Sequence, residues 1–252
     1  MSIPFEPEVL GVTINVHLTL EYLAFILAFR YYVFLRNRRK DTISKTNRLS
    51  IIIGATLGAL IGSRVIGLLE NPLLISSYNY VELLNTKTIM GGLFGGLIGV
   101  EIAKNIIKEG HSSGDLFTLP IIVGIFIGRV GCFLSGTNEF TYGVETDFFL
   151  SMNLGDGVQR HPITLYELVF LLLLFIIVKY YFNQKVNYKG KLFKLFMILY
   201  FGFRFLIEFL KPNEFLLGGL STIQWLCLLC WIYYLPFISK SIAYANKKVH
   251  IL

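Results

Sequence analysis

Long apolar runs separated by short basic segments are the feature that most limits how this chain can fold. A helix needs about 20 apolar residues to cross roughly 30 Å of bilayer hydrocarbon. Seven runs approach that length: 14–35, 50–69, 89–107, 116–134, 163–183, 195–211 and 220–239. Charged residues make up 15% of the chain, against about 25% in a typical soluble domain. The sequence therefore predicts an all-α integral membrane protein with seven transmembrane helices, built as a single polytopic membrane domain over 1–252.

The positions of the basic residues predict the topology. Four segments hold 16 of the 23 lysines and arginines: 36–48, 104–111, 179–194 and 240–248. The segments on the opposite side hold only Lys87, Arg160 and Lys211. Because basic loops stay in the cytoplasm, we expect the N-terminus outside and the C-terminus inside. The excess of basic residues behind the net charge of +7 is then explained by the cytoplasmic loops. We therefore expect no nucleic-acid partner.

Two segments, 72–88 and 135–162, are too polar to span a membrane. We interpret both as outer-face structure, with 135–162 forming an outer-face loop or head region. The N-terminus has no basic region before its first apolar run. This pattern predicts an uncleaved signal anchor rather than a removed signal peptide.

Arg129 and Arg204 lie inside predicted spans, where an arginine costs about 2.5–3.5 kcal/mol on insertion scales and usually serves function. The sixth span also places Tyr200, Arg204 and Glu208 at intervals of four residues, so they share one helix face. Two interpretations stay open: an Arg–Glu pair neutralised inside a bundle, or a polar stripe along a substrate cavity.

The fifth span begins with RHPITLYE, which puts Arg160 and His161 at the membrane surface and Tyr166 and Glu167 about a turn deeper. An outer cavity with several arginines suits an anionic lipid headgroup, because guanidinium groups bind phosphate bidentately and stay charged when desolvated. The glycines of the second and third runs are typical of closely packed membrane helices. The last span contains Cys227 and Cys230 in an apolar context, which favours buried structural thiols.

Several stretches together resemble the prolipoprotein diacylglyceryl transferase family. GRVGCFLSGTNEFTYG at 128–143 resembles its signature, which is close to G-R-x-G-N-F-x-N-G-E-x-x-G. GGLIGV at 95–100 and RHPITLYE at 160–167 resemble the family's H-G-G-L-I-G and R-H-P-S-Q-L-Y-E segments. LYFGFRFLIEFLKP at 199–212 resembles Y-G-x-x-R-x-x-x-E-x-x-R-x-P, and GLSTIQWL at 219–226 is similar to the closing motif. The order and spacing of these stretches agree with the family.

The resemblance implies a transferase that moves the diacylglyceryl group of phosphatidylglycerol to the lipobox cysteine thiol of a preprotein and releases glycerol phosphate. It implies that Arg129 and Arg204 hold the phosphodiester, that Glu208 orients Arg204, and that Tyr200 bonds the headgroup or assists proton removal. Gly131, Gly136 and Gly143 would permit tight backbone turns. The expected catalytic residues are Arg129, Arg204, Tyr200, Glu208 and His161; the expected substrate-binding residues are Arg129, Gly131, Asn138, Glu139, Gly143, Arg160, Gly95 and Gly96.

The expected partners are phosphatidylglycerol, the preprotein segment and membrane lipids, with no cofactor or metal. The expected location is the bacterial cytoplasmic (inner) membrane. Two positions depart from the family pattern. The histidine before Gly-Gly is replaced by Phe94, or by Met90 if the upstream Gly-Gly is aligned, and the signature asparagine is replaced by Cys132.

These departures leave alternatives open. His161 could supply acid–base function, or the substrate thiol needs no strong protein base. The chain could also be a related phospholipid-dependent transferase with a different acceptor, or a lipid-binding or transport protein without chemistry. We interpret Cys132 as a small replacement that packs beside Arg129, not as the reactive group.

Overall fold

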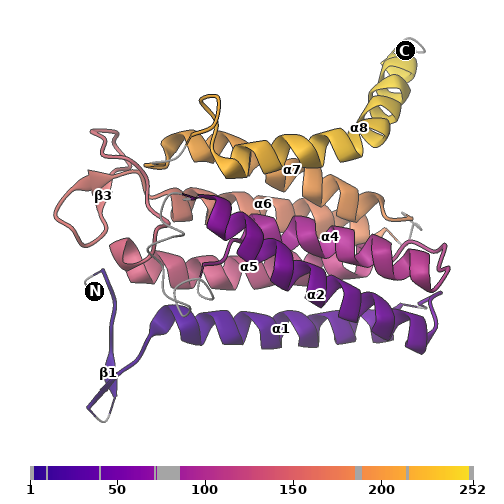
Figure 1. Ribbon diagram of the computed structural model, residues 1–252, viewed down its shortest axis with the longest axis horizontal. Helices are drawn as coiled ribbons and strands as arrows, with labels where there is room; N and C mark the ends of the chain where they lie inside the picture. Colours follow the sequence, from indigo (N-terminus) through magenta and orange to yellow (C-terminus); the bar gives the residue numbers. More distant parts are fainter. Residues whose placement is uncertain are drawn as a thin grey trace. The chain divides into compact units, whose positions relative to one another are not determined.

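The computed structural model describes residues 3–9, 11–39, 41–70, 72, 86–184, 189–213 and 216–249, with side chains described except at 9 and 240–249. These residues are mainly helical (Figure 1). The helices are α1 Val16–Arg38, α2 Lys45–Glu70, α4 Ile89–Ile106, α5 Asp115–Ser135, α6 Ile163–Asn183, α7 Lys191–Ile207 and α8 Thr222–Val249, with 3-10 turns η2 Gly136–Asn138 and η3 Glu208–Leu210. Two short antiparallel hairpins pair β1 Glu8–Val9 with β2 Val12–Thr13 and β3 Met152–Asn153 with β4 Gln159–Arg160.

The chain divides into two compact units. The first comprises residues 1–49, 107–196 and 206–214, and the second comprises 50–106, 197–205 and 215–252. Helices α2 and α7 contribute to both units. That the whole of 1–252 forms one polytopic domain stays a prediction.

Helix α5 is the centre of the first unit, where it packs against α1 and α6. The three helices run side by side in Figure 1. The core between them is apolar, and its buried side chains include Ala24, Leu35, Leu119, Ile122, Leu171, Leu174 and Val178. Asn15 ends the N-terminal segment and starts α1, because its side-chain oxygen accepts the backbone N–H of Leu18 at 2.8 Å. Such a cap satisfies one of the donors left open at a helix start.

Both hairpins lie at one end of the first unit, where α1 begins, α5 ends and α6 begins (Figure 1). The predicted outer-face segment 135–162 forms η2, the β3–β4 hairpin and the loops between them. Gly136 follows the end of α5 with φ +54°, a backbone region that glycine adopts without steric strain. This end therefore contains segment 135–162, and its position at the outer face stays a prediction.

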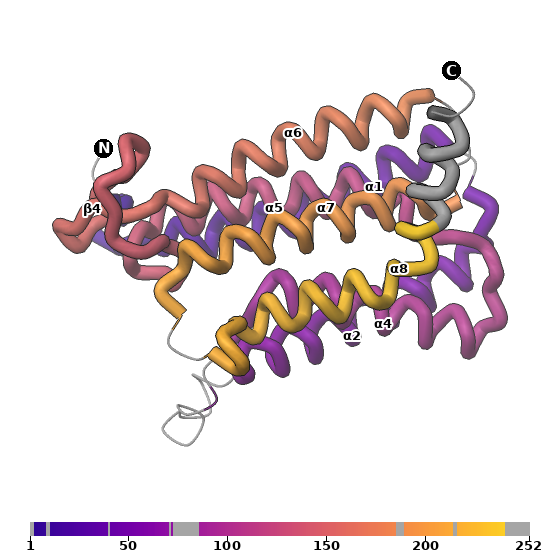
Figure 2. The backbone as a smooth tube through the Cα atoms, turned by 90° about the horizontal axis from the view of Figure 1, so that it is seen from above, coloured from indigo at the N-terminus to yellow at the C-terminus, as the bar shows by residue number. Residues whose placement is uncertain are grey.

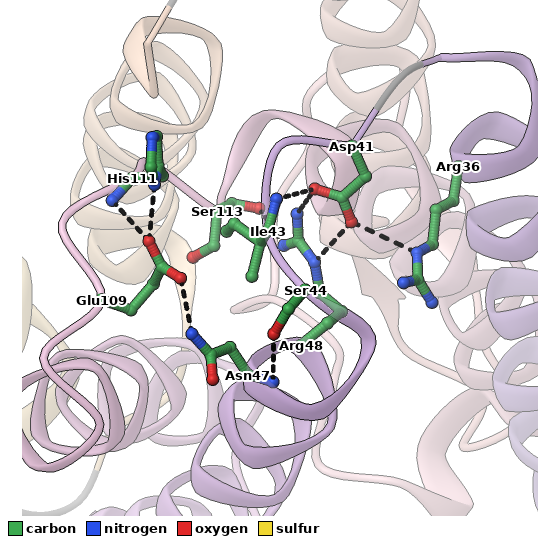
Figure 3. A network of polar contacts seen from close by, with 9 residues as sticks. All are labelled: Arg36, Asp41, Ile43, Ser44, Asn47, Arg48, Glu109, His111 and Ser113. Atoms are coloured by element: carbon green, nitrogen blue, oxygen red, sulfur yellow. Dashed lines mark hydrogen bonds and ion pairs between the residues drawn. The ribbon is translucent and has the colours of Figure 1, made fainter.

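The other end of the first unit carries a network of polar side chains (Figure 3). Arg48, which is 2% exposed, donates to the Asp41 carboxylate and to the Ser113 carbonyl oxygen, the latter at 3.1 Å. Asn47 donates to Glu109 at 2.8 Å. These contacts join two of the predicted cytoplasmic segments, 36–48 and 104–111, to each other and to the start of α5.

In the second unit, α2 and α4 lie side by side (Figure 2) and meet through glycines. A Cβ added to Gly62 would lie 2.8 Å from the Cα of Gly95, and a Cβ added to Gly95 would lie 2.8 Å from the Cα of Gly62. Gly54 and Gly99 form a similar contact. The close-packing interpretation of these glycine-rich runs is thus confirmed, since only residues without a side chain allow the two backbones to approach this far.

Six helices of the described chain have the length and composition of a membrane span: α1, α2, α4, α5 with η2, α6 and the first part of α8. Their surfaces carry large exposed apolar side chains, such as Phe25 at 69%, Ile61 at 65% and Ile232 at 65%, as helices that face lipid require. The predicted span 195–211 corresponds to α7, a shorter helix of 17 residues. The multi-pass architecture is confirmed, while the seven-span orientation stays a prediction. Residues 71 and 73–85, which include most of the predicted outer segment 72–88, lie outside the described residues.

Candidate functional site

A buried ion pair joins α5 to α6 at the end of the first unit that carries the hairpins. Arg129 lies in the last two turns of α5 and is 7% exposed, and Glu167 lies near the start of α6 and is 1% exposed. The Arg129 Nε lies 2.9 Å from the Glu167 Oε1. Buried charges in proteins are paired, and this pair holds a guanidinium inside the helix layer. The sequence predicts Glu167 about a turn below the membrane surface but does not reveal it as the partner of Arg129.

Cys132 links Arg129 to a histidine from the first helix. The Cys132 Sγ lies 3.8 Å from the Arg129 Nη1 and 3.5 Å from the Nε2 of His17. The other ring nitrogen of His17, Nδ1, lies 3.2 Å from the Glu139 Oε1. Glu139, Cys132 and Arg129 come from the signature stretch, whereas His17 is the second residue of α1.

His17 is not among the site residues that the sequence predicts. Its contact with Cys132 joins residues 115 positions apart, so no local motif marks it. One signal was present: the predicted topology puts the start of the first span and the end of the fourth on the same side of the membrane. Gly131 explains the close approach, because a Cβ there would lie 3.3 Å from the Cα of His17. The absence of a side chain at Gly131 therefore lets α1 pack close to α5 at the point where His17 contacts Cys132.

A cavity of about 300 Å³ adjoins this chain of contacts. The N-terminal segment and the start of α1 line one side of it, and Ser135, Asn138 and Glu139 line the other. Asn138 donates to Glu6 at 2.7 Å, which ties η2 to the N-terminal segment. Glu139 is the link between the cavity and His17.

The start of α6 carries a second group of predicted site residues. The His161 Nδ1 lies 3.2 Å from the hydroxyl oxygen of Tyr166, and the Gly143 N–H donates to the His161 carbonyl at 3.0 Å. Arg160 donates to Asp156 at 2.7 Å, and its guanidinium lies 5.0 Å from the centre of the Tyr142 ring. A Cβ on Gly143 would lie 2.6 Å from the His161 Cβ, so this position requires glycine for close backbone approach.

Glu208 also belongs to the first unit. It begins η3, is 1% exposed, and lies 4.0 Å from the Lys211 Nζ. The Val144 N–H donates to the Leu210 carbonyl at 2.8 Å, which connects η3 to the outer-face segment. The ammonium of Lys211 lies 4.5 Å above the Phe140 ring.

The other predicted site residues lie in the second unit. Tyr200 and Arg204 are on α7, and both are buried. Gly95 and Gly96 are on α4, where Gly95 contacts the backbone of α2. The two positions considered for the family histidine are apolar there: Met90 is buried, and Phe94 lies against Phe201 with ring centroids 6.5 Å apart. The substrate roles of these residues stay predictions.

Comparison with known proteins identifies the family. The chain matches the family model described as prolipoprotein diacylglyceryl transferase over residues 8–239. It is 31% identical over 214 residues to a phosphatidylglycerol–prolipoprotein diacylglyceryl transferase of Wolbachia pipientis subsp. Culex pipiens, a match that covers 79% of each chain. Proteins of the same name from Finegoldia magna and Bordetella bronchiseptica are 28% and 30% identical, with 77% and 71% of this chain and 78% and 68% of theirs covered. The match spans the helices that carry Arg129, Glu167 and Arg204, and the chain belongs to the prolipoprotein diacylglyceryl transferase family.

Proposed function

We propose that this protein transfers the diacylglyceryl group of phosphatidylglycerol to the lipobox cysteine of a preprotein, at the outer face of a bacterial cytoplasmic membrane. The observation that carries the proposal is the buried Arg129–Glu167 pair in a multi-pass chain of this family. The names of the similar proteins support the choice of both substrates.

The pair suits a reaction whose substrate carries a phosphodiester. A guanidinium is a planar group with donors arranged in a fork, so it matches a phosphate better than an ammonium does. Glu167 balances the charge of Arg129 and orients it before substrate binds. Donors that are oriented in advance stabilise charge that develops in the transition state, and this effect is large in a site that excludes water.

The chemistry is a displacement at carbon. The sulfur of the acceptor cysteine loses its proton and attacks the glyceryl carbon that bears the phosphate ester. A C–S bond forms as the C–O bond breaks, and glycerol phosphate leaves with the electron pair of that bond. Arg129 and Arg204 stabilise the charge on the leaving phosphate, Glu208 orients Arg204, and Tyr200 bonds the headgroup.

The remaining predicted residues act at the headgroup side. Arg160 and His161 contact the substrate where the β3–β4 hairpin meets α6, and Asn138 and Glu139 contact it beside η2. Gly131, Gly143, Gly95 and Gly96 allow the backbone to lie close to its neighbours. These roles are part of the proposal.

The test is a reconstituted reaction. Purified protein is incubated with phosphatidylglycerol and a lipobox peptide, and the thioether product and glycerol phosphate are both measured. The proposal expects equal amounts of the two products, and it expects Arg129→Ala to lower kcat about 10²–10³-fold.

The same reaction distinguishes the alternatives. Glycerol phosphate without modified peptide would favour a transferase with another acceptor. If neither product forms while a Finegoldia magna relative is active in parallel, the transferase assignment is wrong.

A further inference from the structure

In the proposed reaction the thiol of the acceptor cysteine loses its proton close to Arg129, and an imidazole lies near enough to accept this proton. We propose that His17, held by Glu139, is the general base that takes the proton from the acceptor cysteine. This inference rests on the proposed function and adds a catalytic residue that the sequence motifs do not contain.

The Cys132 Sγ fills the position between His17 and Arg129, and the acceptor sulfur takes this position when the Cys132 side chain turns aside. The Cys132 Sγ lies 3.5 Å from the His17 Nε2 and 3.8 Å from the Arg129 Nη1. The acceptor sulfur must approach a carbon next to the phosphate that Arg129 holds, so its base must act within a few ångströms of the guanidinium. His17 meets this requirement through its place beside Cys132, whereas the ring of His161 lies beside Tyr166, at 3.2 Å, and Phe148, with ring centroids 5.7 Å apart.

Glu139 prepares His17 for this role. Its Oε1 lies 3.2 Å from Nδ1, so the carboxylate favours the tautomer with the proton on Nδ1. The lone pair of Nε2 then points at the position that the Cys132 sulfur occupies. The same carboxylate stabilises the imidazolium that forms when Nε2 takes a proton, as the acid of a catalytic triad does. The His17 side chain is 16% exposed and that of Glu139 is 39% exposed. The imidazole is therefore sheltered from solvent, while the carboxylate that holds it reaches solvent.

The cavity adjoins Glu139 and therefore the Nδ1 side of His17. It is lined by Asn15 and Val16, which precede His17, and by Ser135 and Glu139. On the other side of the ring, next to Arg129, the acceptor cysteine gives its proton to Nε2 and forms the C–S bond as glycerol phosphate leaves. His17 then passes the proton from Nε2 to the departing glycerol phosphate, so the imidazole again carries its single proton on Nδ1 and the base is regenerated.

The experiment compares two acceptors that differ in the atom that must lose a proton. Full-length His17→Gln and wild-type protein are assayed with phosphatidylglycerol and lipobox peptides that contain either cysteine or selenocysteine. A thiol is mostly protonated at neutral pH, whereas a selenol is ionised there without a base. General base catalysis contributes about 10²–10⁴-fold, so we expect His17→Gln to lower kcat about 10²-fold or more with cysteine and far less with selenocysteine.

Two further variants complete the test. His111→Gln is the matched control, since His111 lies in the network at the other end of the first unit and pairs with Glu109; it should leave both rates unchanged. Glu139→Gln leaves the residues of α1 unchanged. It should also lower kcat more with the cysteine peptide than with the selenocysteine peptide, but by a smaller factor than His17→Gln does.

The outcomes separate this inference from the proposed function. If wild-type protein modifies neither peptide, the proposed function fails first. If wild-type protein is active and His17→Gln keeps its rate with cysteine, His17 is not the base. An equal loss with both acceptors would mean that His17 supports structure only, and this too would overturn the inference.

Discussion

Arg129 illustrates how a charge is accommodated in an apolar helix. Its guanidinium is buried, and its ion pair with Glu167 joins α5 to α6. Removing one partner of a buried pair leaves an uncompensated charge, which costs about 3–5 kcal/mol. The pair therefore couples the packing of two helices to the proposed phosphate contact.

The substitution Arg129→Lys separates charge from geometry at this position. Lysine keeps the positive charge but has no planar fork, so we expect kcat to fall about 10²-fold in the phosphatidylglycerol assay. Cys227→Ala is the control, because Cys227 is fully buried in the second unit among apolar residues and should leave turnover unchanged. Similar losses in the two variants would mean that the phosphate site has been misplaced.

The contact between α2 and α4 depends on missing side chains. In a bilayer, helices associate through close packing because lipid is as apolar as the helix surface. We expect Gly95→Ala to destabilise the second unit by about 1–3 kcal/mol, since its Cβ would lie 2.8 Å from the Gly62 Cα. Gly92 lies one turn away on α4, and a Cβ added there would be 3.8 Å from its nearest neighbouring atom. We therefore expect Gly92→Ala to be tolerated. The measurement is the Tm of both variants and of the wild-type protein in detergent. Equal shifts in Tm for the two variants would contradict the close-contact explanation.

The loops at the non-hairpin end of the first unit should respond to acid (Figure 3). Hydrogen bonds from Asn47 and from the backbone and ring of His111 lower the pKa of Glu109 to about 2. Burial acts to raise the pKa of Asp41, but the hydrogen bonds from Arg48 and the Ile43 backbone, together with the charges of Arg48 and Arg36, outweigh it, and the net shift is downward. Both carboxyls therefore bind protons less readily in the folded state than in the unfolded state.

A lowered folded-state pKa stabilises the fold above the unfolded value and loses that contribution as pH falls toward the folded value. For Glu109 the loss runs from 4.5 down to about 2. We expect the Tm of the wild-type protein to exceed that of Glu109→Gln near neutral pH, and the difference to shrink below about pH 4.5. A Tm difference that stays constant across this range would argue against the assigned pKa.

The orientation of the whole chain follows from its basic segments and can be measured directly. Asp147 is exposed in the hairpin segment, and Asn105 is exposed at the end of α4. A membrane-impermeant maleimide should label Asp147→Cys in intact cells and Asn105→Cys only after permeabilisation. The three native cysteines are buried and provide a low background. The reverse pattern of labelling would invert the topology.

Much of the architecture was readable from the sequence because the information is local. The predicted runs 116–134 and 163–183 correspond to α5 Asp115–Ser135 and α6 Ile163–Asn183, since a span is recognised from the hydropathy of its own residues. The same applies to the family motifs, to the placement of Arg129 in a span and to the burial of Cys227 and Cys230. The length of the sixth helix was less predictable, because capping and loop contacts set where α7 ends.

The pairs of side chains that meet across the fold were not readable in this way. The contacts of Arg129 with Glu167, of His17 with Cys132 and of Gly62 with Gly95 each join separate helices. A helix that faces lipid is apolar on nearly every side, so its sequence pattern does not reveal which side faces its neighbours. Helix rotation is set by the fit of side chains and backbones between helices, and this fit brings a histidine from the first helix to the thiol beside Arg129.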